Sequence, residues 1–455
     1  MAADRPERRA WWIWGAAVVA YLAAVFHRGS LGVAGPLALE RFDVGPAALS
    51  AFTVLQVGIY AGMQIPTGLL ADRFGPRRVI TVAVLLLGIG QVLFAIATSY
   101  ALGLAARAVL GLGDALMFVS LLRLVATHFS ARRYALVATV SSALGAMGGV
   151  AATFPLTLAL GTLGWTPTFL LVGALTAGYA AITASFVRDV RAAAPPSRQG
   201  GAAATFRRVR TAWAIPGTRL ALWVHFCTMF ASGALTLLWG FPYLVDGLGV
   251  APAVASVVLS VLIVGQVVGG PVVGALIGRR PEWRMPLVVG YLLVNGLSWI
   301  VLLGWSGGTP PLAVVVVAFL VFAFGGPVST VAFALVRDYN PISQVGTATG
   351  VANAGGHSAT ALAVLLVGLL LDAVQGLGST DAYRIAMLAL PAMLVLGSWR
   401  TLVWWRRARA VVLDALDRGD ETPVSLRRHR WDLPEPATYS STTGSRSMPR
   451  STVPG

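Results

Sequence analysis

The chain has 455 residues, of which 56% are hydrophobic and only 11% are charged, and its formal net charge at pH 7 is +16. A soluble domain needs about 25% charged residues to cover its surface, so this composition excludes a water-soluble globule. The basic residues lie mostly in short loops beside apolar stretches, which favours a membrane protein and excludes a nucleic-acid-binding one.

The first apolar stretch begins at Trp11, after Arg5, Arg8 and Arg9, and continues to about Gly35. It is too long for the apolar part of a secretory signal, which spans about 7–15 residues. We therefore predict a cytoplasmic N-terminus at residues 1–11, followed by the first transmembrane helix.

Twelve stretches have the roughly 20 apolar residues that a helix needs to cross a bilayer. The first six are predicted at residues 12–35, 46–70, 79–97, 101–123, 135–157 and 167–187. The second six are predicted at residues 218–244, 252–277, 286–305, 311–335, 346–371 and 383–403. We expect an all-α integral membrane protein with two six-helix bundles, at residues 12–187 and 218–403.

Two polar segments lie outside these bundles. Residues 188–217 contain Ala-Ala-Ala-Pro-Pro, Gly-Gly and several arginines, which is typical of a cytoplasmic linker. Residues 404–455 become rich in Ser, Thr, Pro and Arg. This composition predicts a largely disordered cytoplasmic tail after a short helix near residues 411–418.

Arginine alternates between the loops. Basic residues occupy the loops after the second, fourth, eighth and tenth spans, and these are Arg73, Arg77, Arg78, Arg132, Arg133, Arg279, Arg280, Arg284 and Arg337. The opposite loops hold only Arg41 and Arg384. The positive-inside rule then places both termini in the cytoplasm. Because all 34 basic residues are arginine, we expect a GC-rich bacterial genome and a bacterial plasma membrane.

The sequence contains no pattern for catalysis. Cys227 is the only cysteine and lies inside an apolar stretch. Neither metal-ligand spacing nor a nucleophile, phosphate or dinucleotide motif is present. We expect no enzymatic activity, no cofactor and no metal site.

The two halves repeat. Moving the sequence by 206 positions superposes Gly68, Leu70, Arg73 and Arg78 on Gly274, Leu276, Arg279 and Arg284. A duplicated six-helix unit is the architecture in which two bundles rock about a central site. We therefore expect a pseudo-symmetric transporter that works by alternating access, as a monomer.

The segment from Gly68 to Arg78, Gly-Leu-Leu-Ala-Asp-Arg-Phe-Gly-Pro-Arg-Arg, resembles the motif between the second and third helices of the major facilitator superfamily. The resemblance implies that Asp72 braces a closed cytoplasmic gate together with Arg73, Arg77 and Arg78. Gly75 would permit the tight turn. The alternative is a basic loop that only sets topology.

A narrower resemblance is to the organic anion:cation symporter branch of that superfamily. Tyr60, Gln64, Pro66, Gly68 and Asp72 follow a similar spacing, and Arg28 precedes Leu-Gly-Val-Ala as in that branch. His27 stands where members usually have Asp, and Arg107 with Asp114 matches their Arg and Glu. The resemblance implies a proton-coupled importer of a small organic anion that is bound by Arg28, Arg107, Tyr60 and Gln64.

Physical reasoning also makes these charges site candidates, because a charge in hydrocarbon costs about 3 kcal/mol or more unless it faces a cavity or partner. At 1.5 Å per residue, Arg28 and Arg107 both fall in the outer half of the membrane and could bind one anion. Asp114 lies two turns from Arg107 on the same face, so anion binding at Arg107 could control its proton. The alternative is a fixed ion-pair network of Arg28, Arg107 and Asp114.

Histidines within the spans are further candidates for proton coupling. His27 and His357 are the main ones, and His225 is a third. For each of them the alternative is a hydrogen-bonded packing role. Gln64, Asn295 and Asn353 are possible cavity donors, although such groups also join membrane helices to each other.

Our sequence-based hypothesis is therefore import of a small organic anion with protons, in a lipid bilayer and without a nucleic-acid partner. The first alternative is proton-coupled efflux of drugs or amphiphilic compounds. Against it, the glycine run at Gly145, Gly148 and Gly149 lacks the Gly-Pro dipeptide typical of such exporters, and we expect these glycines to serve helix packing. The second alternative is a sensor or assembly protein that does not transport.

Overall fold

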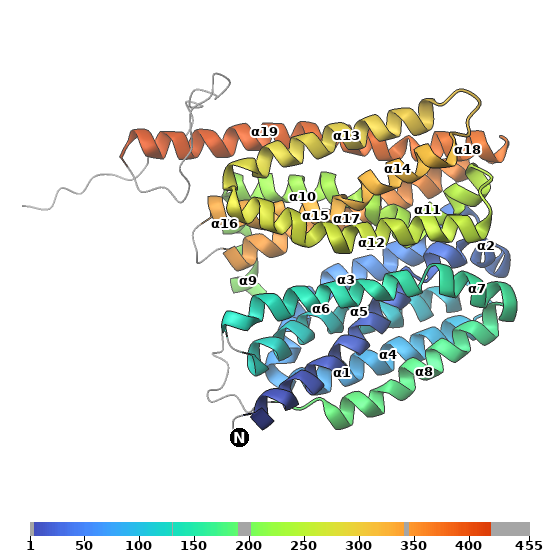
Figure 1. Cartoon of the computed structure of the whole chain (residues 1–455), viewed down its shortest axis with the longest axis horizontal. Coiled ribbons are helices and arrows are strands. Elements are labelled where there is room, and N and C mark those ends of the chain that lie inside the picture. The colour runs from blue at the N-terminus through green and yellow to red at the C-terminus, as the bar shows by residue number, and fades with distance from the viewer. Residues whose placement is uncertain (1–3, 130, 190–201, 341–344, 420–455) are drawn as a thin grey trace, which may run out of the picture.

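The computed structural model describes residues 4–129, 131–189, 202–340 and 345–419. Twelve segments in this part are helical, long and apolar enough to cross a membrane (Figure 1). Each of them overlaps one of the predicted stretches, so the all-α membrane fold with twelve spans is confirmed.

The N-terminal half supplies the first six spans. It consists of α1 (Asp4–Gly29), α2 (Leu31–Phe42), α3 (Pro46–Phe74), α4 (Pro76–Ile96), α5 (Tyr100–His128), α6 (Ala131–Ala151), α7 (Phe154–Leu163) and α8 (Trp165–Phe186). The first span ends with α1, and the chain continues directly into α2. The fifth span is broken between α6 and α7.

The C-terminal half supplies the other six spans and is preceded by α9 (Ala202–Ala214), a helix within the predicted linker. Its seventh span contains α10 (Pro216–Ala234), η1 (Leu235–Trp239), α11 (Gly240–Pro242) and η2 (Tyr243–Gly247). The remaining elements are α12 (Pro252–Arg279), η3 (Pro281–Trp283), α13 (Arg284–Gly304), α14 (Leu312–Ala323), α15 (Gly325–Ser329), α16 (Val331–Tyr339), α17 (Val345–Ala373), α18 (Ser379–Met387) and α19 (Ala389–Asp417).

The two halves form two layers, one from blue to green and one from green to red in Figure 1. α3 packs against α17, and α12 packs against α6 and α7. The repeat of 206 positions relates α3 to α12, and it relates α6 and α7 to most of α17. The contact of α3 with α17 is therefore equivalent to the contact of α12 with α6 and α7. A twofold relation between duplicated units requires this equivalence.

Helix α19 corrects our predicted boundary. We expected the last bundle to end at residue 403 and a largely disordered tail with a short helix near residues 411–418 to follow, but α19 continues without a break to Asp417. The physical reason is a buried stripe formed by Trp404, Ala408 and Val412, which recur every four residues and so share one helix face. Residues 420–455 of the predicted tail lie outside the described residues, as do residues 190–201 of the linker.

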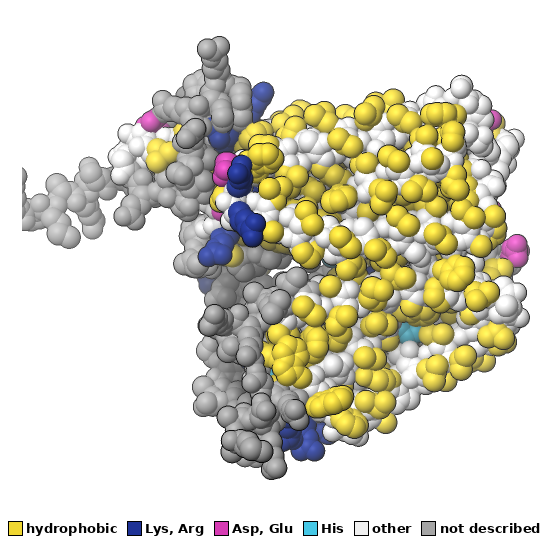
Figure 2. All heavy atoms as spheres, viewed as in Figure 1, with side chains coloured by type: hydrophobic (Ala, Val, Ile, Leu, Met, Phe, Trp, Pro, Cys, Tyr) yellow, Lys and Arg dark blue, Asp and Glu magenta, His cyan; other side chains and the backbone are white. Residues whose placement is uncertain are grey.

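Charge divides the two ends of the molecule. We call one of them the basic end. It contains the start of α1, the turn between α3 and α4, and the end of α19. The other is called the opposite end. Figure 2 shows arginines at the rim of the basic end and a broad hydrophobic band beside them. Arg41 and Arg384 are the exceptions at the opposite end. Arg41 donates to the carbonyl oxygens of Ala95 and Ala97 at the end of α4, and Arg384 donates to that of Leu303 near the end of α13. Their cations thus serve as C-caps.

Close helix contacts explain the glycine run of α6. A Cβ atom on Gly148 would lie 2.0 Å from the carbonyl oxygen of Leu22, and one on Gly145 would lie 2.1 Å from the Tyr21 ring. Both contacts are with α1, so these glycines allow α1 and α6 to approach each other. This supports the packing role that we expected for them.

Candidate functional site

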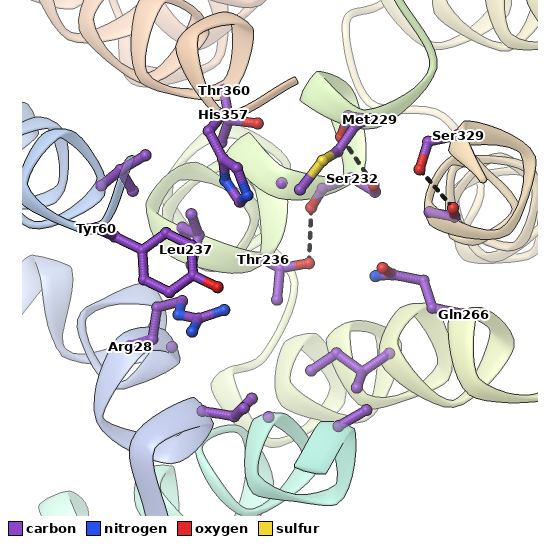
Figure 3. Close-up of a pocket in the computed structure, with 18 of the residues that line it drawn as sticks. Arg28, Tyr60, Met229, Ser232, Thr236, Leu237, Gln266, Ser329, His357 and Thr360 are labelled. Atoms are coloured by element: carbon purple, nitrogen blue, oxygen red, sulfur yellow. Dashed lines mark hydrogen bonds between the residues drawn. The ribbon is translucent and has the colours of Figure 1, made fainter. Parts of the chain in front are cut away.

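A cavity of about 360 Å³ lies where the two halves meet (Figure 3). Its walls come from α1, α3, α5 and α6 of the N-terminal half and from α10, η1, α12, α15, α16 and α17 of the C-terminal half. The polar side chains that line it are Arg28, Gln56, Tyr60, Asp114, His225, Ser232, Thr236, Gln266, Ser329, Asn353, His357 and Thr360. The charged residues of this wall all belong to the N-terminal half.

Arg28 and Asp114 form a bidentate ion pair at this wall. Nε and Nη2 of Arg28 donate to the two carboxylate oxygens of Asp114 at 2.7 Å and 2.6 Å. The Arg28 side chain is 22% exposed, whereas that of Asp114 is 1% exposed. The guanidinium carbon of Arg28 also lies 4.5 Å from the ring centre of Tyr60. Arg28 is therefore the charged group that an incoming ligand meets, with Asp114 behind it.

Arg107 lies away from the cavity. It is fully buried, with its guanidinium carbon 5.3 Å from the ring centre of Phe94. Its Nη1 donates to the carbonyl oxygen of His27 at 3.5 Å, and its Nε and Nη2 have no hydrogen-bond partner among the described residues. We expected Arg107 to share an anion with Arg28 and to control Asp114. The structure instead pairs Asp114 with Arg28, because seven residues place Arg107 about 10 Å further along α5.

His27 is also buried inside the N-terminal half rather than at the cavity. One ring nitrogen lies 3.1 Å from the side-chain oxygen of Gln91, and the other lies 2.9 Å from the hydroxyl of Thr176. Both nitrogens thus have partners on α4 and α8. This arrangement matches the packing alternative for His27, and its role in proton coupling stays a prediction.

The C-terminal half contributes neutral polar groups. The ring of His357 lies 5.2 Å from the ring of Tyr60 across the interface, and Figure 3 shows both at one side of the cavity near Arg28. His225 donates through Nδ1 to the carbonyl oxygen of Ser329 at 3.2 Å. Its Nε2 has no partner among the described residues. His357 and His225 are therefore the histidines that line the cavity.

Two glutamines of the cavity wall were missed by the sequence analysis. Gln56 lines the cavity and neither polar atom of its amide has a partner among the described residues, whereas Gln64 donates back to the carbonyl oxygen of Tyr60. Helical spacing was the available signal, because Gln56 lies four residues before Tyr60 and shares its face. Gln266 lies 206 positions after Tyr60, so the repeat could have identified it. Asn295 instead donates to the hydroxyl of Tyr291 inside the C-terminal half.

Comparison with known families decides the identity of this architecture. The sequence profile of the Major Facilitator Superfamily matches residues 17–325 and 224–440, which together cover most of the chain. The chain belongs to the Major Facilitator Superfamily. It is a multi-pass membrane protein and a transporter of a solute.

Solved structures of other major facilitators share the fold. A bacterial homologue of the human lysosomal transporter Spinster, in an inward-facing and unoccupied conformation, gives a TM-score of 0.69 at 16% identity, covering 88% of this chain and 97% of that one. A D-xylose–proton symporter gives a TM-score of 0.65 at 15% identity, covering 87% and 97%. At these identities the likeness concerns the fold alone.

Two curated relatives match parts of this facilitator. The probable sulfoacetate transporter SauU of Cupriavidus necator is 29% identical over 178 residues, or 39% of this chain and 41% of that protein. Monocarboxylate transporter 11 of Homo sapiens is 32% identical over 171 residues, or 36% of each chain. The matched segments thus span about two fifths of each relative.

The turn at Gly75, within the motif from Gly68 to Arg78, is held by an aspartate that was not predicted from the sequence. Gly75 has a φ of 82°, and Asp189, after α8, accepts from the backbone N–H of Arg77 at 2.9 Å. The Arg77 side chain donates to the carbonyl oxygen of Ala184. Arg73 stacks on Phe74, and Arg78 is exposed. The structure does not describe the surroundings of Gly68 or the side chain of Asp72, so the proposed gate of Asp72 stays a prediction.

Hydrogen bonds join the two halves between the cavity and the opposite end. The backbone N–H of Ala47, at the start of α3, donates to the carboxylate of Asp372 near the end of α17 at 3.0 Å. Ser50 donates to the carbonyl oxygen of Val364 at 2.9 Å. Asp372 thereby caps a helix of the other half, since the N-cap residue of α3 is a glycine without a side-chain acceptor. This contact must break if the halves separate at that end.

Proposed function

We propose that this major facilitator imports a small organic anion together with protons, across the cytoplasmic membrane of a bacterium. The observation that carries the proposal is the Arg28–Asp114 pair at the cavity wall. A ligand carboxylate or sulfonate offers the same two acceptor oxygens as Asp114, and arginine binds such groups with parallel hydrogen bonds. An anion in the cavity therefore competes with Asp114 for Arg28.

Competition of this kind couples the anion to a proton. Asp114 is almost fully buried, so a carboxylate displaced from Arg28 is left without a compensating charge. A buried carboxylate without a partner is neutralised by taking up a proton. Binding of the anion and protonation of Asp114 then favour each other, and neither alone leaves the site electrically balanced.

The other groups of the cavity suit a small polar ligand. The amide of Gln56 has no hydrogen-bond partner among the described residues, and the guanidinium group of Arg28 lies against the ring of Tyr60. The names of the two curated relatives refer to sulfoacetate and to monocarboxylates, both of which are organic anions. The basic end is assigned to the cytoplasm by the positive-inside rule, with both termini there. Since one chain supplies both walls, we propose a monomer.

Uptake into proteoliposomes tests this function. With an imposed inward proton gradient, we expect saturable accumulation of one or more members of a panel of sulfonates, monocarboxylates and sugar acids. Arg28→Gln should abolish it, and Asp114→Asn should retain anion exchange but lose accumulation driven by the gradient. Gln56→Ala should weaken uptake, while Gln64→Ala on the same helix serves as a matched control and should behave as wild type. Uptake that does not depend on the proton gradient and that persists in Arg28→Gln would refute the proposal.

The same vesicles test the exporter hypothesis. Apolar residues of the cavity wall such as Met229 and Phe333 suit an amphiphilic ligand. A cationic substrate, however, must compete with Arg28 for Asp114. Extrusion of cationic dyes that requires Asp114, without anion uptake, would favour efflux.

A further inference from the structure

Arginine and tryptophan form a stacked cluster at the basic end of the C-terminal half, away from the cavity. We call it the Arg–Trp cluster, and its members are Trp213 of α9, Arg219 and Trp223 of α10, and Trp399, Arg400, Trp404 and Arg407 of α19. The guanidinium carbons of Arg219 and Arg407 lie 4.6 Å and 4.7 Å from the ring centre of Trp404. That of Arg400 lies 5.2 Å from the ring centre of Trp223.

These three cations have no acidic partner in the part of the chain that the structure describes. Arg219 donates only to the carbonyl oxygen of Trp213. On α19, Asp414 is two turns beyond Arg407 and pairs with Arg418 instead. Stacking on a ring covers the face of a guanidinium group but leaves its in-plane N–H donors available. The cluster is therefore rich in positive charge and lacks an anion.

Buried donors in the cluster also lack acceptors. Trp404 is 6% exposed, and its indole Nε1 has no hydrogen-bond partner among the described residues. Nε of Arg400 is buried and likewise without a partner. Leaving a buried donor unsatisfied is unfavourable, and more so when the group is charged. These two donors, one of them on an arginine of the cluster, indicate an acceptor that is not among the described residues.

The surroundings of the cluster favour a membrane lipid as the source of that acceptor. On the side of α19 towards the opposite end, Val395 and Trp399 are 70% and 58% exposed, and Leu396 and Leu402 are also exposed. Such an apolar face belongs in the hydrocarbon of the bilayer, and Figure 1 shows α19 along the outer edge of the C-terminal half. The cluster thus lies where lipid-facing surface ends and charged surface begins, at the level of lipid headgroups.

We propose that the Arg–Trp cluster binds the headgroup phosphate of an anionic phospholipid, whose acyl chains lie along the exposed apolar face of α19. Phosphate oxygens accept from the in-plane donors of Arg400 and Arg407. Trp404, between Arg219 and Arg407, keeps both cations in position. The bound lipid would hold the extended part of α19 against α10 and α9.

Lipid binding to the purified full-length protein tests this proposal. In mild detergent, titration with phosphatidylglycerol should leave one more retained lipid by native mass spectrometry than titration with phosphatidylcholine, and should raise the thermal unfolding midpoint. Arg407 is exposed, so Arg407→Gln should fold normally. Because a charge-assisted hydrogen bond contributes about 1.5–3 kcal/mol, this variant should weaken phosphatidylglycerol binding at least about tenfold.

Arg280 provides the matched control. It stacks on Trp283 at 5.9 Å at the same end of the same half, but outside the cluster. Arg280→Gln should change phosphatidylglycerol affinity less than twofold. Equal binding of the two lipids, or an equal loss in both variants, would overturn the proposal. Soluble glycerol phosphate that binds as tightly as the lipid would overturn the assignment to a membrane lipid.

Discussion

The side chains of Arg28 and Asp114 are unequally exposed, so replacing one should lower the stability of the protein more than replacing the other. Removing Arg28 by Arg28→Ala leaves the carboxylate of Asp114, 1% exposed, without a counter-charge. Breaking a buried pair in this way costs about 3–5 kcal/mol. Asp114→Asn leaves a cation that is 22% exposed to the cavity and still stacks on Tyr60. Asp114→Asn should therefore lower the free energy of unfolding by about 1.5–3 kcal/mol, the contribution of a charged hydrogen bond. This is about half the loss expected for Arg28→Ala.

Unfolding of the purified variants in detergent checks this order. We expect unfolding midpoints to fall from wild type to Asp114→Asn to Arg28→Ala, and the double variant to be more stable than Arg28→Ala, because it removes the stranded charge. The Arg284–Asp338 pair is the control, since its side chains are 17% and 19% exposed and its two single variants should be equally destabilised. The reasoning would be wrong if Arg28→Ala and Asp114→Asn lowered the unfolding midpoint equally and the double variant lowered it by the sum of the two.

Three further predictions concern the contacts that hold the two halves and the turn. Asp372→Ala removes the acceptor for the Ala47 N–H, so it should weaken the cap across the halves by about 0.5–2 kcal/mol and favour opening at the opposite end. Fluorescence transfer between labels on that end measures the opening, and Asp381→Ala, at an exposed aspartate, should leave it unchanged. Gly148→Ala should lower the unfolding midpoint by overpacking worth about 1–3 kcal/mol, whereas Gly161→Ala, which meets nothing within 4 Å, should not. Gly75→Ala should reduce transport and stability together, because its φ is positive and a Cβ atom would lie 2.2 Å from a carboxylate oxygen; wild-type behaviour would contradict the role of this turn.

The spans were predictable because membrane insertion is governed by the local length and polarity of the chain. Errors arose where other rules take over. The extension of α19 past residue 403 is stabilised by a buried stripe that includes Trp404 and Val412, in a stretch interrupted by charged residues such as Arg406 and Arg407. The structure also has π turns at Leu235–Trp239 and Tyr243–Gly247, for which the sequence offered no local pattern.

The charges within the membrane could be read from the sequence, but which of them pair and which of them line the cavity could not. The sequence shows that Arg28, Arg107 and Asp114 are charges within the membrane, and that Arg107 and Asp114 share a helix face. It does not show how α1 is rotated about its axis relative to α5. That rotation turns Arg28 towards Asp114 and leaves His27, one residue earlier, on the far side of α1 with Gln91. Asp189 was missed because its contact with Arg77 joins residues that are 112 positions apart in the sequence.

The distribution of charge between the halves bears on how an anion can be released. The ion pair belongs entirely to the N-terminal half, while the facing wall offers neutral groups such as His357, Thr236 and Gln266. A ligand held by both walls loses its neutral contacts when the halves move apart, but it keeps Arg28. Under the proposed function, release requires Asp114 to give up its proton and return to Arg28, because no other described acidic side chain lines the cavity. We therefore propose that proton loss from Asp114 on one side of the membrane is the step that frees the anion there.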